Sequence, residues 1–118
     1  MLELKSFNPF KLKPTHLLNP DIYFDLERKL RESGKAEFED PIIILGEEQI
    51  IYDGHHKTAI TRNQRKGGIF GHHILSQKDF LQIPKKYWHA EYTPETHTYE
   101  QTYVVLRKQV LADDEVFN

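Results

Sequence analysis

The chain has 118 residues and a formal net charge of −2, with 38% hydrophobic and 29% charged residues, which is enough for one globular domain spanning residues 1–118. A net charge near zero argues against a uniformly basic nucleic-acid binder, and the absence of cysteine excludes disulfides, thiolate metal sites and cysteine nucleophiles. No apolar run approaches the roughly 20 residues that span a bilayer, and the N-terminus lacks a signal-peptide pattern, so we expect a cytoplasmic protein without a membrane partner.

The first half of the chain predicts an extended segment, a helix and two strands. Three prolines within the first twenty residues disfavour a helix there, so we expect extended backbone with a short strand. Apolar residues recur at helical spacing over residues 21–33, and Gly34 follows as a stop signal. The apolar runs Ile42–Leu45 and Ile50–Tyr52 are separated by four polar or glycine residues, which predicts a hairpin of two strands.

The second half predicts a helix over Lys57–Lys66, a strand over Ile69–Leu75 and a short helix over Gln77–Leu81. A last helix is predicted to begin at Thr93, which is suited to capping it, and to present one apolar stripe that consists of Tyr99, Tyr103, Leu106 and Val110. Together these elements predict an α+β fold with a small mixed sheet, several helices and a long C-terminal amphipathic helix.

The most informative stretch is the junction between the second hairpin strand and the following helix. There the apolar run stops at Asp53-Gly54, and His55, His56 and Lys57 follow. A strand that turns tightly into a helix presents free backbone N–H groups at the positive end of the helix dipole, which favours an anion such as phosphate. The alternative is that Asp53-Gly54 serves only the geometry of the turn.

The order of elements and two segments of the sequence resemble the ParB/sulfiredoxin-like superfamily, which includes ParB-like nuclease domains. The segments are Pro41–Leu45 and Tyr52–Ala59, and the resemblance is strongest over residues 10–75. In that family a Gly-x-His/Arg-Arg turn holds nucleotide phosphates at a helix N-terminus. The resemblance therefore implies that Gly54, His56 and Lys57 bind phosphate, with lysine replacing the usual arginine and its bidentate fork.

Two activities of the superfamily do not fit this chain. Sulfiredoxins carry a cysteine directly after the glycine of the turn, where this chain has His55. Chromosome-partition ParB proteins carry a helix-turn-helix domain after the nucleotide domain, and too few residues follow Leu75 for one. Site-specific centromere binding is therefore not expected.

The candidate site residues fall into three groups. The catalytic candidates are Asp53, His55, His56 and Lys57, with a histidine as proton carrier and Lys57 stabilising developing charge. The phosphate-binding candidates are Gly54, His56, Lys57, Thr58 and Arg62. A metal site is a further hypothesis, built from Asp53, His56 and one of His72 or His73; imidazole and carboxylate ligands suit zinc or manganese better than magnesium. ATP or CTP is the nucleotide cofactor that we consider.

Three functions remain open from the sequence. The first is an enzyme acting on phosphate, either a nuclease or a nucleotide-dependent hydrolase or transferase. The second is a non-catalytic module that uses the same turn to bind a nucleotide or a protein partner. The third is an HNH-type metal-dependent nuclease that uses Gly-His-His at residues 54–56 or 71–73, with His89 and His97 as further ligands. Nucleotide or nucleic acid is the expected partner in the first and third cases.

Overall fold

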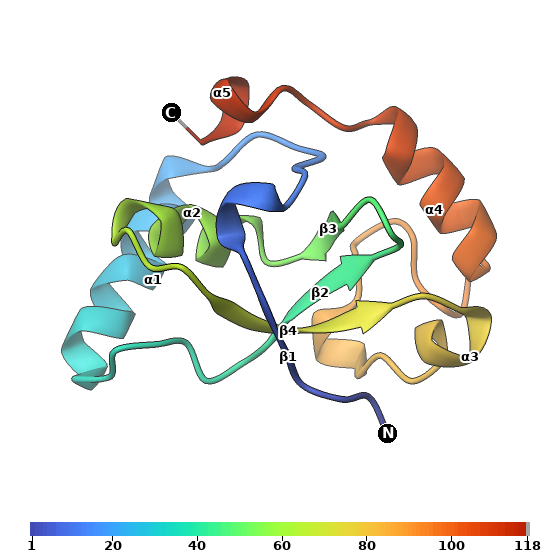
Figure 1. Cartoon of the computed structure of the whole chain (residues 1–118), viewed down its shortest axis with the longest axis horizontal. Helices are drawn as coiled ribbons and strands as arrows, with labels where there is room; N and C mark the ends of the chain where they lie inside the picture. The colour runs from blue at the N-terminus through green and yellow to red at the C-terminus, as the bar shows by residue number, and fades with distance from the viewer. Residues whose placement is uncertain (118) are drawn as a thin grey trace.

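The computed structural model describes residues 1–117, and their backbone forms one four-stranded mixed sheet flanked by helices. Figure 1 shows α1 and α2 beside one end of the sheet, and α3 and α4 at the other end. The elements in chain order are β1 (Lys5–Phe7), a 3-10 helix (Pro9–Lys11), α1 (Pro20–Ser33), β2 (Ile42–Leu45), β3 (Ile50–Asp53), α2 (His55–Asn63), β4 (Ile69–Ile74), α3 (Gln77–Phe80), a second 3-10 helix (Lys85–Tyr87), α4 (Tyr99–Lys108) and α5 (Asp113–Val116). The predicted α+β class is confirmed.

The sheet has the order β1-β4-β2-β3. Strand β2 pairs antiparallel with β3 and parallel with β4, and β4 pairs antiparallel with β1. Alternate residues of β2 enter two cores, because successive side chains of a strand point to opposite faces. Ile43 and Leu45 pack with Phe80 and Leu106 on one face, and Ile42 and Ile44 belong to a second cluster on the other.

The elements of the first half lie close to their predicted positions, since their signals are local. Helix α1 is capped by the Asn19 side chain, which accepts a hydrogen bond from the Asp21 N–H, and it ends at Gly34 in the left-handed conformation. Helix α2 begins two residues earlier than predicted, at His55, and ends earlier, at Asn63.

The long C-terminal helix is not found as predicted. Thr98, not Thr93, caps α4, because Thr98 and Gln101 form a reciprocal capping box. Helix α4 therefore has ten residues, while Thr93 belongs to the preceding turn, where its hydroxyl accepts from the Glu95 N–H. The predicted stripe does face the core through Tyr99, Tyr103, Leu106 and Val110. A further short helix, α5, follows it and was not predicted.

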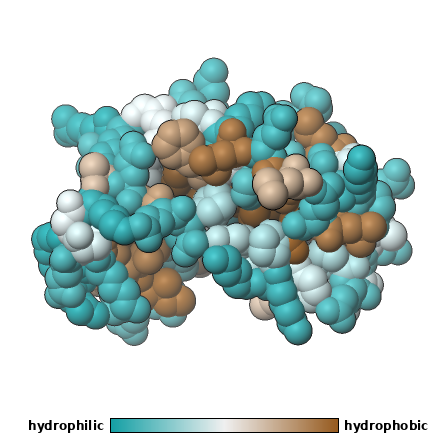
Figure 2. All heavy atoms as spheres, turned by 90° about the horizontal axis from the view of Figure 1, so that it is seen from below, coloured by the Kyte–Doolittle hydropathy of each residue, from teal (hydrophilic) through white to brown (hydrophobic). Residues whose placement is uncertain are grey.

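Figure 2 shows one face on which hydrophobic residues appear as separate patches between hydrophilic ones. Of the large apolar side chains, Leu17 and Phe24 are each 63% exposed and lie before and within α1. In the described part of the chain, no helix is long and apolar enough to cross a membrane.

Candidate functional site

Strand β3 contains an irregularity at the residue before Asp53. Ile44 lies opposite Ile51, whereas the preceding Ile43 lies opposite Asp53, so Tyr52 is an extra residue on β3. A bulge of this kind bends the strand and changes the direction of the next side chain. Asp53 is therefore placed by the bulge at the end of the strand, where the chain leaves the sheet.

Gly54 is required at the turn for two reasons. Its φ is +117°, a backbone conformation that residues with a Cβ rarely adopt. A Cβ at this position would also lie 2.3 Å from Cγ2 of Ile42. The glycine thus lets the start of α2 approach β2 closely.

Helix α2 begins without a side-chain cap. In the first turn of α2, the Thr58 N–H donates a backbone hydrogen bond to the Gly54 carbonyl at 2.9 Å. The N–H groups of the three preceding residues lie at the positive end of the helix dipole, and no side chain of the described residues caps them. The start of α2 therefore has the backbone chemistry of an anion site.

A groove of about 420 Å³ opens at this helix start. We call it the histidine groove, because four of the seven histidines line it. Its lining residues are His16, Ile22, Leu26, Tyr52, Asp53, Gly54, His55, His56, Lys57, Trp88, His89 and Ala90. The fold thus brings together the turn, the loop before α1 and the loop after the second 3-10 helix.

Both histidines of the turn accept hydrogen bonds from backbone N–H groups of the segment before α1. Nε2 of His55 accepts a hydrogen bond from the Thr15 N–H at 2.9 Å, and Nε2 of His56 accepts one from the Asn19 N–H at 2.9 Å. A backbone N–H only donates, so both ring nitrogens must be unprotonated. The pair therefore fastens the loop before α1 onto the start of α2.

His55 is more deeply buried than His56. It is 2% exposed, and its ring lies on the His16 ring with centroids 3.6 Å apart. Burial, followed by the neighbouring His16, His56 and His89 rings, lowers the pKa of His55 from 6.5 to about 2. The structure places the predicted proton carrier His55 in a structural position, as a neutral hydrogen-bond acceptor. Burial also lowers the pKa of His56.

Asp53 and Lys57 are the two charged residues that line the groove. In residues 1–117 the Asp53 carboxylate accepts no hydrogen bond, and burial raises its pKa while Lys57 opposes that rise. Lys57 is half-buried, and its Nζ donates to the Asp40 carbonyl at 3.3 Å. A carboxylate with a raised pKa beside a lysine in a groove is typical of functional sites.

Two of the predicted phosphate-binding residues, Thr58 and Arg62, do not line the histidine groove. Thr58 is fully buried, and its hydroxyl donates to the Gly54 carbonyl at 2.8 Å. Arg62 is 8% exposed and donates to the carbonyls of Pro9 and Leu12 and to the Asp113 carboxylate. Its guanidinium also lies 3.9 Å from the centre of the Phe117 ring. Arg62 therefore joins the two ends of the chain and does not face the groove.

The metal site expected from Asp53, His72 and His73 finds no support in the geometry. Both histidines lie within β4 and contact carbonyls, of Glu3 in the case of His72 and of Gly46 in the case of His73. Among the described residues, no three histidine, aspartate or glutamate side chains form a metal-holding group. Strand β4, which carries Gly71, His72 and His73, lies inside the sheet between β1 and β2.

His16 and His89 were not predicted as parts of the phosphate site. His16 precedes α1 and His89 follows the second 3-10 helix, so neither is near the turn in sequence. The high histidine content was the only sequence signal for them. His89 is half-buried, with its ring 5.7 Å from Tyr52 and 5.3 Å from Tyr92, and Tyr52 donates to the Tyr92 carbonyl at 2.5 Å.

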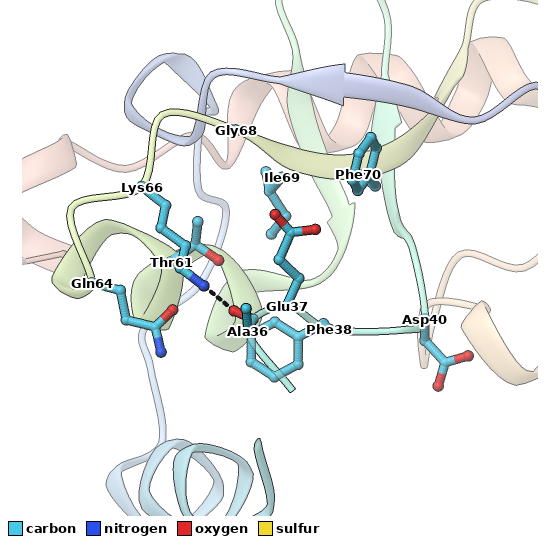
Figure 3. A pocket seen from close by; sticks show the side chains of 10 residues that line it. All are labelled: Ala36, Glu37, Phe38, Asp40, Thr61, Gln64, Lys66, Gly68, Ile69 and Phe70. Atoms are coloured by element: carbon cyan, nitrogen blue, oxygen red, sulfur yellow. Dashed lines mark hydrogen bonds between the residues drawn. The ribbon is translucent and has the colours of Figure 1, made fainter. Parts of the chain in front are cut away.

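A second hollow lies beneath the 36–40 loop, away from the histidine groove (Figure 3). Its walls come from this loop, α2 and β4, and Lys66 donates to the Ala36 carbonyl. Its volume of about 20 Å³ suits about one water molecule. The hollow is too small for a nucleotide. The histidine groove is the candidate functional site because the residues of the predicted turn, Asp53 to Lys57, line it.

Comparisons with known proteins concern the fold. No family model and no curated protein matches the chain. A Pnob8-like ParB-N domain is similar at 18% identity and a TM-score of 0.48, over 67% of this chain and 32% of that one. A crystallised protein from Agrobacterium tumefaciens is similar at 13% identity and a TM-score of 0.49, over 92% of this chain and 50% of that one. This chain thus spans half or less of either structure's length.

Proposed function

We propose that this protein binds the phosphate of a nucleotide or nucleic acid in the histidine groove and acts on it, as a nuclease or a nucleotide-dependent hydrolase or transferase. The observation that carries the proposal is the meeting of three features in one groove. These are the uncapped start of α2, the Lys57 ammonium and the Asp53 carboxylate. The first two attract phosphate, and the third is a proton-transfer group.

The binding free energy that the helix start and Lys57 can supply indicates how much must come from other contacts with the ligand. A helix N-terminus contributes about 0.3–1 kcal/mol towards binding an anion, and a partly exposed lysine contributes about as much. A dissociation constant of about 1 mM corresponds to about −4 kcal/mol, so inorganic phosphate alone should bind weakly. Trp88 lines the groove, and stacking of a base on an aromatic ring adds about 1–3 kcal/mol. A nucleotide is therefore the better ligand.

One observation favours a non-catalytic nucleotide-binding module as the second candidate. Nε2 of both His55 and His56 is occupied by a backbone N–H. Neither nitrogen can take a proton without losing that hydrogen bond, which removes the turn's two most obvious proton carriers. In this case the groove would bind the nucleotide without turnover.

Calorimetric titration with AMP and with inorganic phosphate tests the proposal. Lys57→Ala should weaken AMP binding about two- to fivefold, since a partly exposed charge contact is worth about 0.3–1 kcal/mol. Asp53→Asn should strengthen inorganic phosphate binding about threefold, because it removes a negative charge from the groove. Arg65→Ala, at an exposed residue beyond α2, is the matched control and should change neither affinity.

Oligonucleotide cleavage and nucleotide hydrolysis assays then separate the two candidates. Turnover that is lost in Lys57→Ala supports the enzyme, whereas AMP binding without turnover supports the module. Equal AMP affinity in the wild type, Lys57→Ala and Arg65→Ala would exclude the groove as the phosphate site.

A further inference from the structure

The rings of His16 and His89 are held in opposite hydrogen-bonding states. Nδ1 of His16 contacts the Leu17 carbonyl at 2.8 Å, and a carbonyl only accepts, so this nitrogen carries the proton. Nδ1 of His89 accepts from the N–H groups of Glu91 and Tyr92 at 3.0 and 3.3 Å. In the neutral rings, Nε2 of His16 is therefore an acceptor and Nε2 of His89 is a donor.

Both Nε2 atoms are free of other hydrogen bonds among the described residues, and both histidines line the histidine groove. The His16 ring is held against His55, which is itself fixed by Thr15. The two histidines thus add a positioned acceptor and a positioned donor to the groove.

The polar groups of the groove then fall into two sets. Lys57, the start of α2 and Nε2 of His89 donate, whereas Nε2 of His16 and the Asp53 carboxylate accept. A phosphate group without protons accepts hydrogen bonds and cannot satisfy the second set. A ligand that satisfies both sets carries hydrogen-bond donors near its phosphate, and the hydroxyl groups of a ribose are such donors.

We infer that the groove selects ribonucleotides over deoxyribonucleotides, with His16 and Asp53 accepting hydrogen bonds from the ribose hydroxyls and His89 donating to the phosphate. This inference rests on the proposed phosphate site and names its ligand class. It also gives the Asp53 carboxylate a hydrogen-bond donor as its partner, which the phosphate cannot be. Carboxylates that accept from ribose hydroxyls are common in nucleotide sites.

The test compares AMP with dAMP, which share a base and a phosphate, by calorimetry at pH 8, where imidazole rings are neutral. A hydrogen bond between neutral groups is worth about 0.5–1.5 kcal/mol, so the wild type should bind AMP about 3- to 10-fold more tightly. His16→Phe keeps a ring to stack on His55 and removes the acceptor. It should reduce the preference for AMP over dAMP and leave dAMP affinity unchanged.

His72→Ala is the matched control, since His72 lies on β4 outside the groove, and it should keep the full preference for AMP. Equal affinity of the wild type for AMP and dAMP would overturn the inference while leaving the phosphate site intact. An undiminished preference in His16→Phe would overturn the role of His16. Failure of both nucleotides to bind would overturn the proposed function and this inference together.

Discussion

Lys57 and Arg62 lie on the same short helix, yet their surroundings differ. Lys57 is half-buried at the start of α2, where the groove opens, and its side chain makes one hydrogen bond within residues 1–117, at 3.3 Å. Arg62 lies near the end of α2, where its guanidinium donates to two carbonyls and a carboxylate and covers Phe117. One cation remains available to a ligand, and the other holds the fold together.

The same division separates His55 from His16. Their rings are stacked, but His55 is buried and bonded to Thr15, whereas His16 is exposed with Nε2 directed to no other described residue. Residues of one chemical type therefore separate into a set that supports the fold and a set that lines the groove. We expect the supporting set to govern stability and the groove-lining set to govern binding.

Among the substitutions that test this comparison, we expect the largest loss of stability at Arg62. Arg62→Leu removes hydrogen bonds to the Pro9 and Leu12 carbonyls and leaves both without their donor. Hydrogen bonds to a charged group are worth about 1.5–3 kcal/mol each, so the free energy of unfolding should fall by about 3 kcal/mol or more. Asp113 is 60% exposed, so its ion pair adds little to this value. Urea denaturation measures the change.

The control for this prediction is Arg65→Leu, which should change the free energy of unfolding by less than about 0.5 kcal/mol. Folded Arg62→Leu, assayed at low temperature, should bind AMP like the wild type. A loss of AMP affinity in Arg62→Leu without a loss of stability would mean that Arg62 contacts the ligand.

A second effect is the acid sensitivity that His55 gives to the fold. Its pKa is about 2 in the folded state and 6.5 when exposed. Below pH 6.5 the unfolded chain therefore takes up a proton that the folded state does not, so stability falls as the pH falls. At pH 4 the difference of about 2.5 units corresponds to about 3 kcal/mol. Urea denaturation at pH 7.5 and pH 4 measures it.

His55→Gln sharpens this comparison, since a glutamine oxygen accepts from the Thr15 N–H without titrating. The variant should be less stable than the wild type at pH 7.5 but should lose about 3 kcal/mol less between pH 7.5 and pH 4. Parallel pH profiles for the two proteins would show that His55 is not the buried neutral ring described above.

Much of the fold was accessible from the sequence because its signals are local. The β-branched runs of β2 and β3 and the glycine that ends α1 each act within a few residues. The start of α4 was misplaced because Thr93 and Thr98 both suit a cap, and only Thr98 has a partner, Gln101, for a capping box.

The site was predicted in part for the same reason. The turn at Asp53-Gly54 depends on adjacent residues, and the structure places it at the mouth of a groove. The hydrogen-bond partners of Arg62 lie about fifty residues away in the sequence on either side. His16 and His89 reach the groove from loops that are distant in the sequence. No spacing in the sequence encodes these contacts, which arise from packing of the whole domain.

The most direct test of the division along α2 is an amide NMR titration of the wild-type protein with AMP. If phosphate binds at the start of α2, the largest chemical-shift changes should occur at the N–H groups of His56 and Lys57. The N–H groups of Arg62 and Arg65 should change little. Largest changes at Arg62 and Arg65, or no changes at the helix start up to about 10 mM AMP, would contradict the account.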